Sequence, residues 1–440
     1  MKTIKSDALR FTLPVIAENI FTTGVGLVYS AIVGGISASS LAAMGTGNQA
    51  MNLFVTLFAA ITTGSVVMTA QLTGRGDIPR ASRVVEHTLL LAPAVSLVVM
   101  ALLLAVSSPL IRLLMPGAQA AFVKESTDYF RMLLLSLPGL ITMNALTGIL
   151  RASGESRLAL LDSILVNVVQ IASAYAFINR MDMGIQGAGC AYVVCRYAGA
   201  LAMVIAVFGH HRGFRVEGRR IFRPSLPVVR EILRVGLPTT VDTLSVQAGY
   251  LINNSLLIGL GVDAASTYNV IATIITFTGI CQGIGSTSAT TLVGQRVGAG
   301  DLPGARRRMN RILLYTFAAT TVLCLVACAF PRFFVGLFSS DPDVISDSVH
   351  LLWLILPFCY VAVGVNVTEP STRAGGDTKY VMLTCSACVW LIRLPLTWLF
   401  CYRLGMSVAG VWLANIISLV GRTAFCLSRV YGRKWGQRPI

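Results

Sequence analysis

Long apolar runs follow one another along the chain, and short polar loops separate them. A helix needs roughly 20 mostly apolar residues to cross a bilayer, so each run is long enough to span one. We therefore predict an all-α membrane protein with twelve transmembrane helices. They lie near residues 9–36, 41–71, 86–107, 126–150, 158–178, 188–209, 236–260, 264–295, 311–330, 347–370, 380–401 and 409–430. An even number of crossings places both termini on one side of the membrane.

The two halves of the chain carry the same pattern, which indicates an internal repeat. Corresponding segments are Leu13-Pro14 and Leu237-Pro238, Gly76-Asp77 and Gly300-Asp301, Arg151-Ala-Ser-Gly154 and Arg373-Ala-Gly-Gly376, and Gly184 and Gly405. Six helices in each copy predict two pseudo-symmetric lobes with the same orientation in the membrane. We expect an N-terminal lobe at 1–209 (helices 1–6), a basic cytoplasmic linker at 210–234 and a C-terminal lobe at 235–440 (helices 7–12).

Composition and charge agree with this picture. The mean hydropathy is +0.73 and only 12% of the residues are charged, as in an integral membrane protein. A net charge of +16 would suggest a nucleic-acid partner in a soluble protein. Here most Lys and Arg residues occupy alternate loops, which is typical of loops on the cytoplasmic side. We therefore expect a multi-pass protein of the inner (plasma) membrane, with both termini cytoplasmic, lipid contacts and no nucleic-acid partner.

The chain lacks the usual signs of an enzyme or a metalloprotein. Its ten cysteines lie mostly inside apolar runs, and Cys385-x-x-Cys388 within one helix indicates packing rather than a metal or redox site. The sequence has no His-Glu-x-x-His and no Gly-x-Ser-x-Gly motif. We expect no catalytic residues, no metal and no cofactor other than a coupling ion.

Two carboxylates inside the apolar runs are the main candidates for chemistry. Glu18 and Asp242 each follow a proline by one helical turn, Pro14 and Pro238, at corresponding positions of the two halves. A charged carboxylate in the membrane is costly, so it is protonated, paired or facing water. Each proline frees a backbone carbonyl and allows the helix to bend. The acids are either protonatable or cation-binding groups next to a bend, or hydrogen-bonding groups between packed helices.

The glycine-rich loops have a structural interpretation. In Gly74-Arg-Gly-Asp-Ile-Pro79 and Gly298-Ala-Gly-Asp-Leu-Pro303, glycine permits a positive φ, Asp can cap a helix and proline can begin it. The loops at 151–157 and 373–379 are expected to form similar turns.

Further polar residues lie within the predicted helices. We expect Asp162 to pair with Arg157, and Glu369 with Arg373, near helix ends. Arg393 lies deep enough to need a partner or a wet cavity.

Several fragments in order resemble the bacterial multidrug and toxic compound extrusion (MATE) family of secondary transporters. They are the paired Leu-Pro-x-x-x-Glu/Asp starts, Leu41-Ala-Ala-Met-Gly-x-x-Asn-Gln49, Val293-Gly-Gln-Arg-Val-Gly-Ala-Gly-Asp301, Leu150-Arg-Ala-Ser-Gly154, Leu391-Ile-Arg-Leu-Pro395, Gly410-Val-Trp-Leu-Ala414 and Arg429…Lys434-Trp435. The resemblance covers nearly the whole chain. It implies twelve helices in two lobes and a monomer that exports amphipathic, often cationic organic compounds in exchange for H⁺ or Na⁺.

The chain also departs from that family at two positions. Many members have an aspartate where this sequence has Tyr29, and a second one four residues after an asparagine that matches Asn167, where Ile171 stands here. If coupling persists, the natural carriers are Glu18 and Asp242. Their polar neighbours would come from Asn19, Asn167 and Gln170 in the first half and from Asn253 and Arg393 in the second.

Two other functions compete with drug export. A lipid-linked oligosaccharide flippase of related fold would need several Lys or Arg residues facing a central cavity, and only Arg196 and Arg393 are candidates. A membrane-embedded enzyme is the alternative from a different class, but the sequence shows no dense set of polar residues suited to chemistry.

Overall fold

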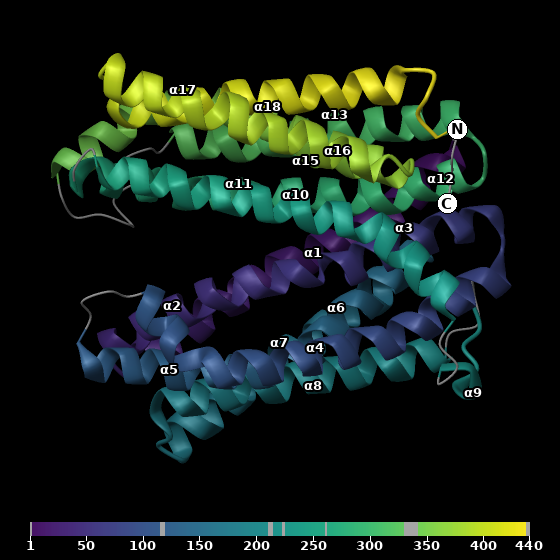
Figure 1. The fold of residues 1–440 in the computed structure, drawn as a ribbon, viewed down its shortest axis with the longest axis horizontal. Helices are drawn as coiled ribbons and strands as arrows, with labels where there is room; N and C mark the ends of the chain where they lie inside the picture. The colour runs from purple at the N-terminus through teal and green to yellow at the C-terminus, as the bar shows by residue number, and fades with distance from the viewer. Residues whose placement is uncertain are drawn as a thin grey trace. The chain divides into compact units, whose positions relative to one another are not determined.

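The computed structural model describes residues 2–114, 119–209, 214–221, 225–259, 262–329 and 342–436, and nearly all of them are helical (Figure 1). No strand occurs within these ranges. The all-α fold class predicted from the sequence is confirmed.

The helices of the described ranges form twelve continuous runs, as predicted. The first six are α1 (Lys2–Gly34); α2 (Ala38–Val55) joined to α3 (Ala59–Arg75); α4 (Ile78–Leu114); α5 (Ala120–Leu135) joined to α6 (Leu137–Ala152); α7 (Ser156–Ala174) with a π-helical turn at Tyr175–Arg180; and α8 (Gly184–Gly209). The short α9 (Gly218–Ile221) follows. The last six are α10 (Leu226–Ile258); α11 (Val262–Ser288) joined to α12 (Gly294–Gly298); α13 (Leu302–Ala329); α15 (Pro342–Ala374); α16 (Thr378–Ala387) continued through α17 (Leu394–Trp398) to Arg403; and α18 (Ser407–Tyr431).

The surface of the bundle suits lipid. By length and hydropathy alone, seven described helices can cross a membrane, or eight if α5 and α6, which meet at a 47° bend, form one span. Large apolar side chains face outward, such as Leu102 (64% exposed) and Ile205 (63%). Charged side chains are enclosed instead, such as Asp162 and Asp242. A soluble protein shows the opposite distribution, so the fold agrees with a membrane protein.

Corresponding turns of the two halves have the same backbone geometry. Gly76 and Gly300 have φ angles of +76° and +77°, and Gly154 and Gly376 have φ angles of +98° and +89°. A residue with a Cβ atom is strained at such angles, so glycine is required at these helix ends. The backbone therefore repeats where the sequence repeats.

The two aspartates of the glycine-rich loops cap the helices that follow them. The Oδ1 atom of Asp77 accepts a hydrogen bond from the backbone N–H of Arg80 (3.1 Å), and that of Asp301 accepts one from Gly304 (2.8 Å). These bonds satisfy donors that the first helical turn leaves free. The capping role predicted from the sequence is confirmed.

The chain forms two compact units, Met1–Thr240 and Val241–Ile440. The predicted linker occupies 210–234, of which 210–213 and 222–224 lie outside the described residues. α10 begins at Leu226, earlier than the predicted start at 236. Three backbone N–H groups of the linker donate to side chains of α4: Arg215 to Ser82, Glu217 to Glu86 and Ser225 to His87. The linker is thus held against the first unit.

One helix lies at the centre of each unit. In the first unit α6 packs against α3, α4 and α8, and most of its side chains are buried. In the second unit α15 packs against α11, α13 and α18. These two helices carry Arg151 and Arg373 near their C-terminal ends, so the fold brings both arginines into the interior.

Candidate functional site

A buried ion pair joins α1 to α6 in the first unit. The Nη2 atom of Arg151 donates to the Oε1 atom of Glu18, and the two side chains are only 19% and 14% exposed. The other carboxylate oxygen, Oε2, is buried with no hydrogen-bond partner among the described residues, and so is the Nε atom of Arg151. Glu18 is therefore paired, one of the three states that the sequence analysis considered. The ion pair therefore leaves one oxygen of Glu18 and one nitrogen of Arg151 without a hydrogen-bond partner in a low-dielectric site.

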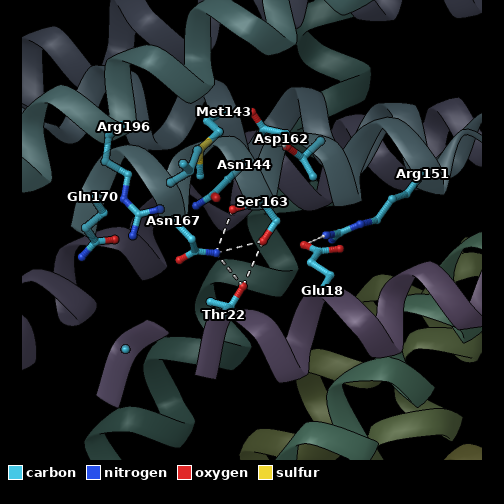
Figure 2. Close-up of a pocket in the computed structure, with 13 residues that line it drawn as sticks. Glu18, Thr22, Met143, Asn144, Arg151, Asp162, Ser163, Asn167, Gln170 and Arg196 are labelled. Atoms are coloured by element: carbon cyan, nitrogen blue, oxygen red, sulfur yellow. Dashed lines mark hydrogen bonds and ion pairs between the residues drawn. The ribbon is translucent and has the colours of Figure 1, made fainter. Parts of the chain in front are cut away.

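The ion pair opens onto a cavity of about 380 Å³ within this unit (Figure 2). Residues of α1, α6, α7 and α8 line it: Glu18, Thr22, Gly26, Met143, Asn144, Thr147, Arg151, Asp162, Ser163, Val166, Asn167, Gln170 and Arg196. The candidates Glu18, Asn167 and Gln170, which are far apart in sequence, border the same space.

Hydrogen bonds connect α1 to α7 along one wall of this cavity. Thr22 and Ser163 share a hydrogen bond through their hydroxyl groups (2.9 Å), and Asn167 donates from Nδ2 to Thr22 Oγ1 (3.2 Å) and to the Ser163 carbonyl (2.8 Å). Asn19 donates to the Val15 carbonyl of its own helix (2.8 Å) and is not among the lining residues. Asn167 thus belongs to the cavity wall, whereas Asn19 does not.

Asp162 lies in the cavity and not at a helix-end ion pair. The predicted pairing with Arg157 is wrong, because no such ion pair occurs among the described residues, and Asp162 instead points inward between α6 and α8. Its Oδ2 atom receives only a long hydrogen bond from Thr147 (3.5 Å), and its Oδ1 atom is buried without a hydrogen-bond partner within the described ranges. α7 approaches α8 closely here, since a Cβ atom at Gly199 would come within 3.3 Å of Oδ1.

Arg196 enters the cavity from α8. Its guanidinium lies over the ring of Tyr192, 4.5 Å from the ring centroid. Figure 2 shows it on the side of the cavity where Gln170 lies, away from the pair of Glu18 and Arg151. The cavity therefore holds two acids and two arginines, of which only one acid and one arginine are paired with each other.

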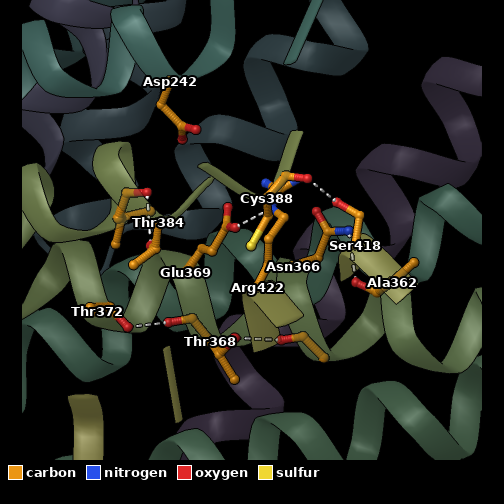
Figure 3. A network of polar contacts seen from close by, with 12 residues as sticks. Asp242, Ala362, Asn366, Thr368, Glu369, Thr372, Thr384, Cys388, Ser418 and Arg422 are labelled. Carbon is orange, nitrogen blue, oxygen red and sulfur yellow. Dashed lines mark hydrogen bonds and ion pairs between the residues drawn. The ribbon is translucent and has the colours of Figure 1, made fainter. Parts of the chain in front are cut away.

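The second unit contains a corresponding but larger ion-pair network. Arg373 donates to Asp242 and, at 3.4 Å, to Glu369, and Arg422 donates to Glu369 at 2.7 Å. Figure 3 shows Glu369 and Arg422 facing each other across this network. All four residues are largely enclosed, with Asp242 2% exposed. The predicted pairing of Glu369 with Arg373 is confirmed.

The two acids singled out by the sequence thus have equivalent partners. Glu18 pairs with Arg151, Asp242 pairs with Arg373, and each partner begins the corresponding Arg-Ala-x-Gly turn. The sequence analysis assigned these turns a structural role, missed Arg151, and named Arg373 only as the partner of Glu369. The repeat itself was the available signal, because two acids and two arginines recur at corresponding positions.

The remaining candidates are spread over the two units. The hydroxyl of Tyr29 donates to the Ala188 carbonyl (2.9 Å), so Tyr29 joins α1 to α8. Asn253 is buried, and neither atom of its side-chain amide has a hydrogen-bond partner within the described ranges. Arg393 lies over the ring of Tyr250 at 4.1 Å, but its Nε and Nη2 atoms are buried without a hydrogen-bond partner in the described residues. Pro14 and Pro238 both lie inside helices, α1 and α10, as predicted.

Three side chains of the second unit are arranged so that they could hold a metal ion. One ligand atom each of Asp242, Glu369 and Cys385 lies within 4.8 Å of the others. Arg373 and Arg422 already donate to the two carboxylates, and their positive charges oppose a bound cation. The geometry therefore favours an internal ion-pair network over a metal centre at this place.

Comparison with known proteins gives matches over the whole chain. A model of the MatE family matches residues 14–176 and 238–399, one match in each half. A "Probable multidrug resistance protein NorM" from Thermotoga maritima is 22% identical over 99% of this chain and 94% of its own length. A protein of the same description from Pseudomonas putida is 28% identical over 98% of this chain and 94% of its own. The "Uncharacterized transporter YisQ" of Bacillus subtilis is 24% identical, with the same coverage of 98% and 94%.

Solved structures share the fold. An outward-facing multidrug resistance MATE family transporter of the MOP superfamily has a TM-score of 0.90 at 21% identity and covers 97% of this chain and 96% of its own. A MOP superfamily transporter from Pyrococcus furiosus, for which a binding pocket of reverse polarity suggests a different function, has a TM-score of 0.88 at 21% identity, with coverage of 96% and 94%. A MATE structure in the bent conformation has a TM-score of 0.87 at 20% identity, with coverage of 97% and 95%.

Proposed function

Since this chain belongs to the MatE family of multidrug efflux transporters, we propose that it exports small organic molecules in exchange for protons. As a member of that family it is a multi-pass membrane transporter and not an enzyme. The observation that carries the proposal is the Glu18–Arg151 pair at the edge of a polar cavity inside the membrane bundle. A charge pair in such a place responds strongly to the gain or loss of one proton.

The cavity offers two carboxylates for the proton. Asp162 has one weak contact and one unpartnered oxygen, so it accepts a proton with little loss of hydrogen bonding. A proton on Glu18 removes the counterion of Arg151 and breaks the link between α1 and α6. Both carboxylates line the same cavity as Arg151 and Arg196, so the charge on each of these four groups affects the others. Proton occupancy and cargo occupancy of this cavity therefore disfavour each other, as an exchange cycle requires.

The charges of the cavity favour H⁺ over Na⁺. A bound Na⁺ needs several free oxygen ligands, but Arg151 occupies one oxygen of Glu18 and repels a nearby cation. A proton needs only a single carboxylate oxygen.

The helix that carries Glu18 can bend beside it. Pro14 lies inside α1 one turn before Glu18, and Pro238 lies inside α10 one turn before Asp242. One of the solved relatives is described in a bent conformation. We propose that proton uptake at Glu18 changes the bend of α1 at Pro14, and that Asp242 contributes to coupling from the second lobe.

Transport in proteoliposomes tests the proposal. We expect a fluorescent organic cation to be transported under a pH gradient in sodium-free buffer, and no additional transport under a Na⁺ gradient at uniform pH. Transport that requires Na⁺ would rule out proton exchange, and protein-free liposomes provide the baseline.

The orientation in the membrane follows from the basic loops. We propose that both termini are cytoplasmic, in the inner (plasma) membrane. A reporter fused after Ile440 should then be active in the cytoplasm, and one inserted near Asp341 should be active outside it. Both positions lie outside the described residues. Reporters that are active on the same side would contradict the odd number of crossings that the twelve-helix topology places between these two positions.

An oligosaccharide flippase is less consistent with the charges. Of the arginines that the sequence analysis considered, Arg393 lies against the Tyr250 ring, and Arg196 alone lines the cavity.

A further inference from the structure

Arg196 differs from Arg151, the other arginine of the cavity, because no acid forms an ion pair with it within the described ranges. No ion pair to Arg196 occurs among the described residues, and its Nε atom is buried without a hydrogen-bond partner there. Its close contact is Tyr192, whose ring lies 4.5 Å from the guanidinium and stabilises the cation, and whose hydroxyl accepts a hydrogen bond from it. A cation that lines a low-dielectric cavity with an unused donor is costly unless a ligand satisfies that donor.

The four charges of the cavity do not cancel locally. Glu18 and Arg151 form an ion pair, whereas Asp162 and Arg196 interact electrostatically but form no ion pair within the described residues. Along α7, Asp162 and Gln170 are separated by about 12 Å, at roughly 1.5 Å per helical residue. Figure 2 shows Arg196 beside Gln170 and Asp162 nearer to the ion pair. The cavity therefore has an unpaired negative group towards one end and an unpaired positive group towards the other.

Two neutral hydrogen-bond donors line the cavity together with its positive group. The side-chain amides of Asn144 and Gln170 line the cavity together with Arg196 and can each donate hydrogen bonds. A guanidinium presents its donors as a planar fork that matches a carboxylate, and such a pair is stronger than a neutral hydrogen bond.

We propose that Arg196 is an anion-recognising residue, and that it binds a carboxylate of the cargo within the N-terminal lobe. The inference rests on the proposed function, because it assumes that the cavity receives cargo. It changes the class of cargo expected from the sequence, from a simple organic cation to a compound that carries a carboxylate. A basic group on the same molecule is drawn towards Asp162, so a zwitterion uses both ends of the cavity.

A matched pair of dyes separates the effect of a carboxylate on binding from the effect of the cation. Rhodamine B carries a delocalised cation and a free carboxylate, and its ethyl ester keeps the cation and lacks the acid. Binding of each is measured by fluorescence anisotropy with the purified protein in phosphatidylcholine nanodiscs, without any ion gradient. We expect Arg196→Gln to weaken binding of rhodamine B about 10- to 100-fold, as for the loss of one charged hydrogen-bonding partner, and to leave binding of the ester unchanged. Arg196→Lys retains the charge but not the planar fork of donors. Its affinity for rhodamine B should lie between those of the wild type and Arg196→Gln.

Arg403→Gln is the control, since Arg403 also lies over an aromatic ring, that of Trp398, but does not line this cavity. It should change neither affinity. Equal losses for the acid and the ester in Arg196→Gln, or the same loss in Arg403→Gln, would overturn the proposal. So would a wild-type protein that binds the ester but not rhodamine B. Because no gradient is present, the result does not depend on which ion drives transport.

Discussion

Glu18→Gln is expected to reduce proton-driven efflux to the level of protein-free liposomes, while the protein still folds and inserts. The amide keeps the shape of the side chain and an oxygen that accepts from Arg151, but it cannot take up and release a proton. The loss should therefore appear in transport under a pH gradient and much less in stability. Efflux of a fluorescent organic cation from proteoliposomes, with the thermal stability of the same preparation, measures both.

Glu155→Gln is the matched control for this variant. Glu155 follows the same Arg-Ala-Ser-Gly turn but does not line the cavity, so its amide should transport like the wild type. Exchange of the two charges, Glu18→Arg with Arg151→Glu, should restore the ion pair and stability but not efflux, because the carboxylate then lies on α6. Wild-type efflux and wild-type pH dependence in Glu18→Gln would assign Glu18 to helix packing.

Arg373→Ala is expected to lower the free energy of unfolding by about 3–5 kcal/mol, the usual loss when one partner of a buried ion pair is removed. The reason is that Asp242, 2% exposed, loses its arginine, while Arg422 stays engaged with Glu369. Unfolding by denaturant in mixed micelles measures the change. Adding Asp242→Asn to Arg373→Ala should recover part of the loss, because no buried charge is then left unpaired.

A pair at the surface provides the comparison. Arg80 and Glu231 form an ion pair at 3.0 Å, but their side chains are 42% and 38% exposed. Arg80→Ala should therefore cost no more than about 1 kcal/mol. Similar losses in Arg80→Ala and Arg373→Ala would show that burial does not set the strength of the Asp242–Arg373 pair.

The two proposals about the cavity can fail separately. The efflux of Glu18→Gln tests whether Glu18 carries the coupling proton. The binding of rhodamine B and its ester tests whether Arg196 recognises a carboxylate. A transporter with both properties exchanges protons for a cargo that carries a carboxylate. The sequence analysis did not reach the second point, because Arg196 was weighed there only as a sign of a flippase.

The sequence by itself determined the fold class, the twelve helices and the doubling of the chain. Apolar runs of spanning length have few alternatives to membrane helices, because a backbone in lipid must satisfy its own hydrogen bonds. Gly76 and Gly300 mark corresponding turns because only glycine adopts their positive φ without strain, and Asp77 and Asp301 cap helices through contacts three residues away. Such local requirements are readable from the order of the residues.

Only the tertiary structure decided which charges meet. Glu18 and Arg151 are distant in sequence, and their contact depends on how α1 packs on α7 and on where α6, which also contacts α7, places Arg151. Periodicity gives the face of a helix but not the neighbour that this face contacts. Asp162 shows the same limit: its nearby Arg157 suggested a helix-end pair, yet in the packed helices its carboxylate lies in the cavity, close to Thr147 of α6 and Gly199 of α8. The site consists of long-range contacts between helices, so it became visible only when the helices were packed.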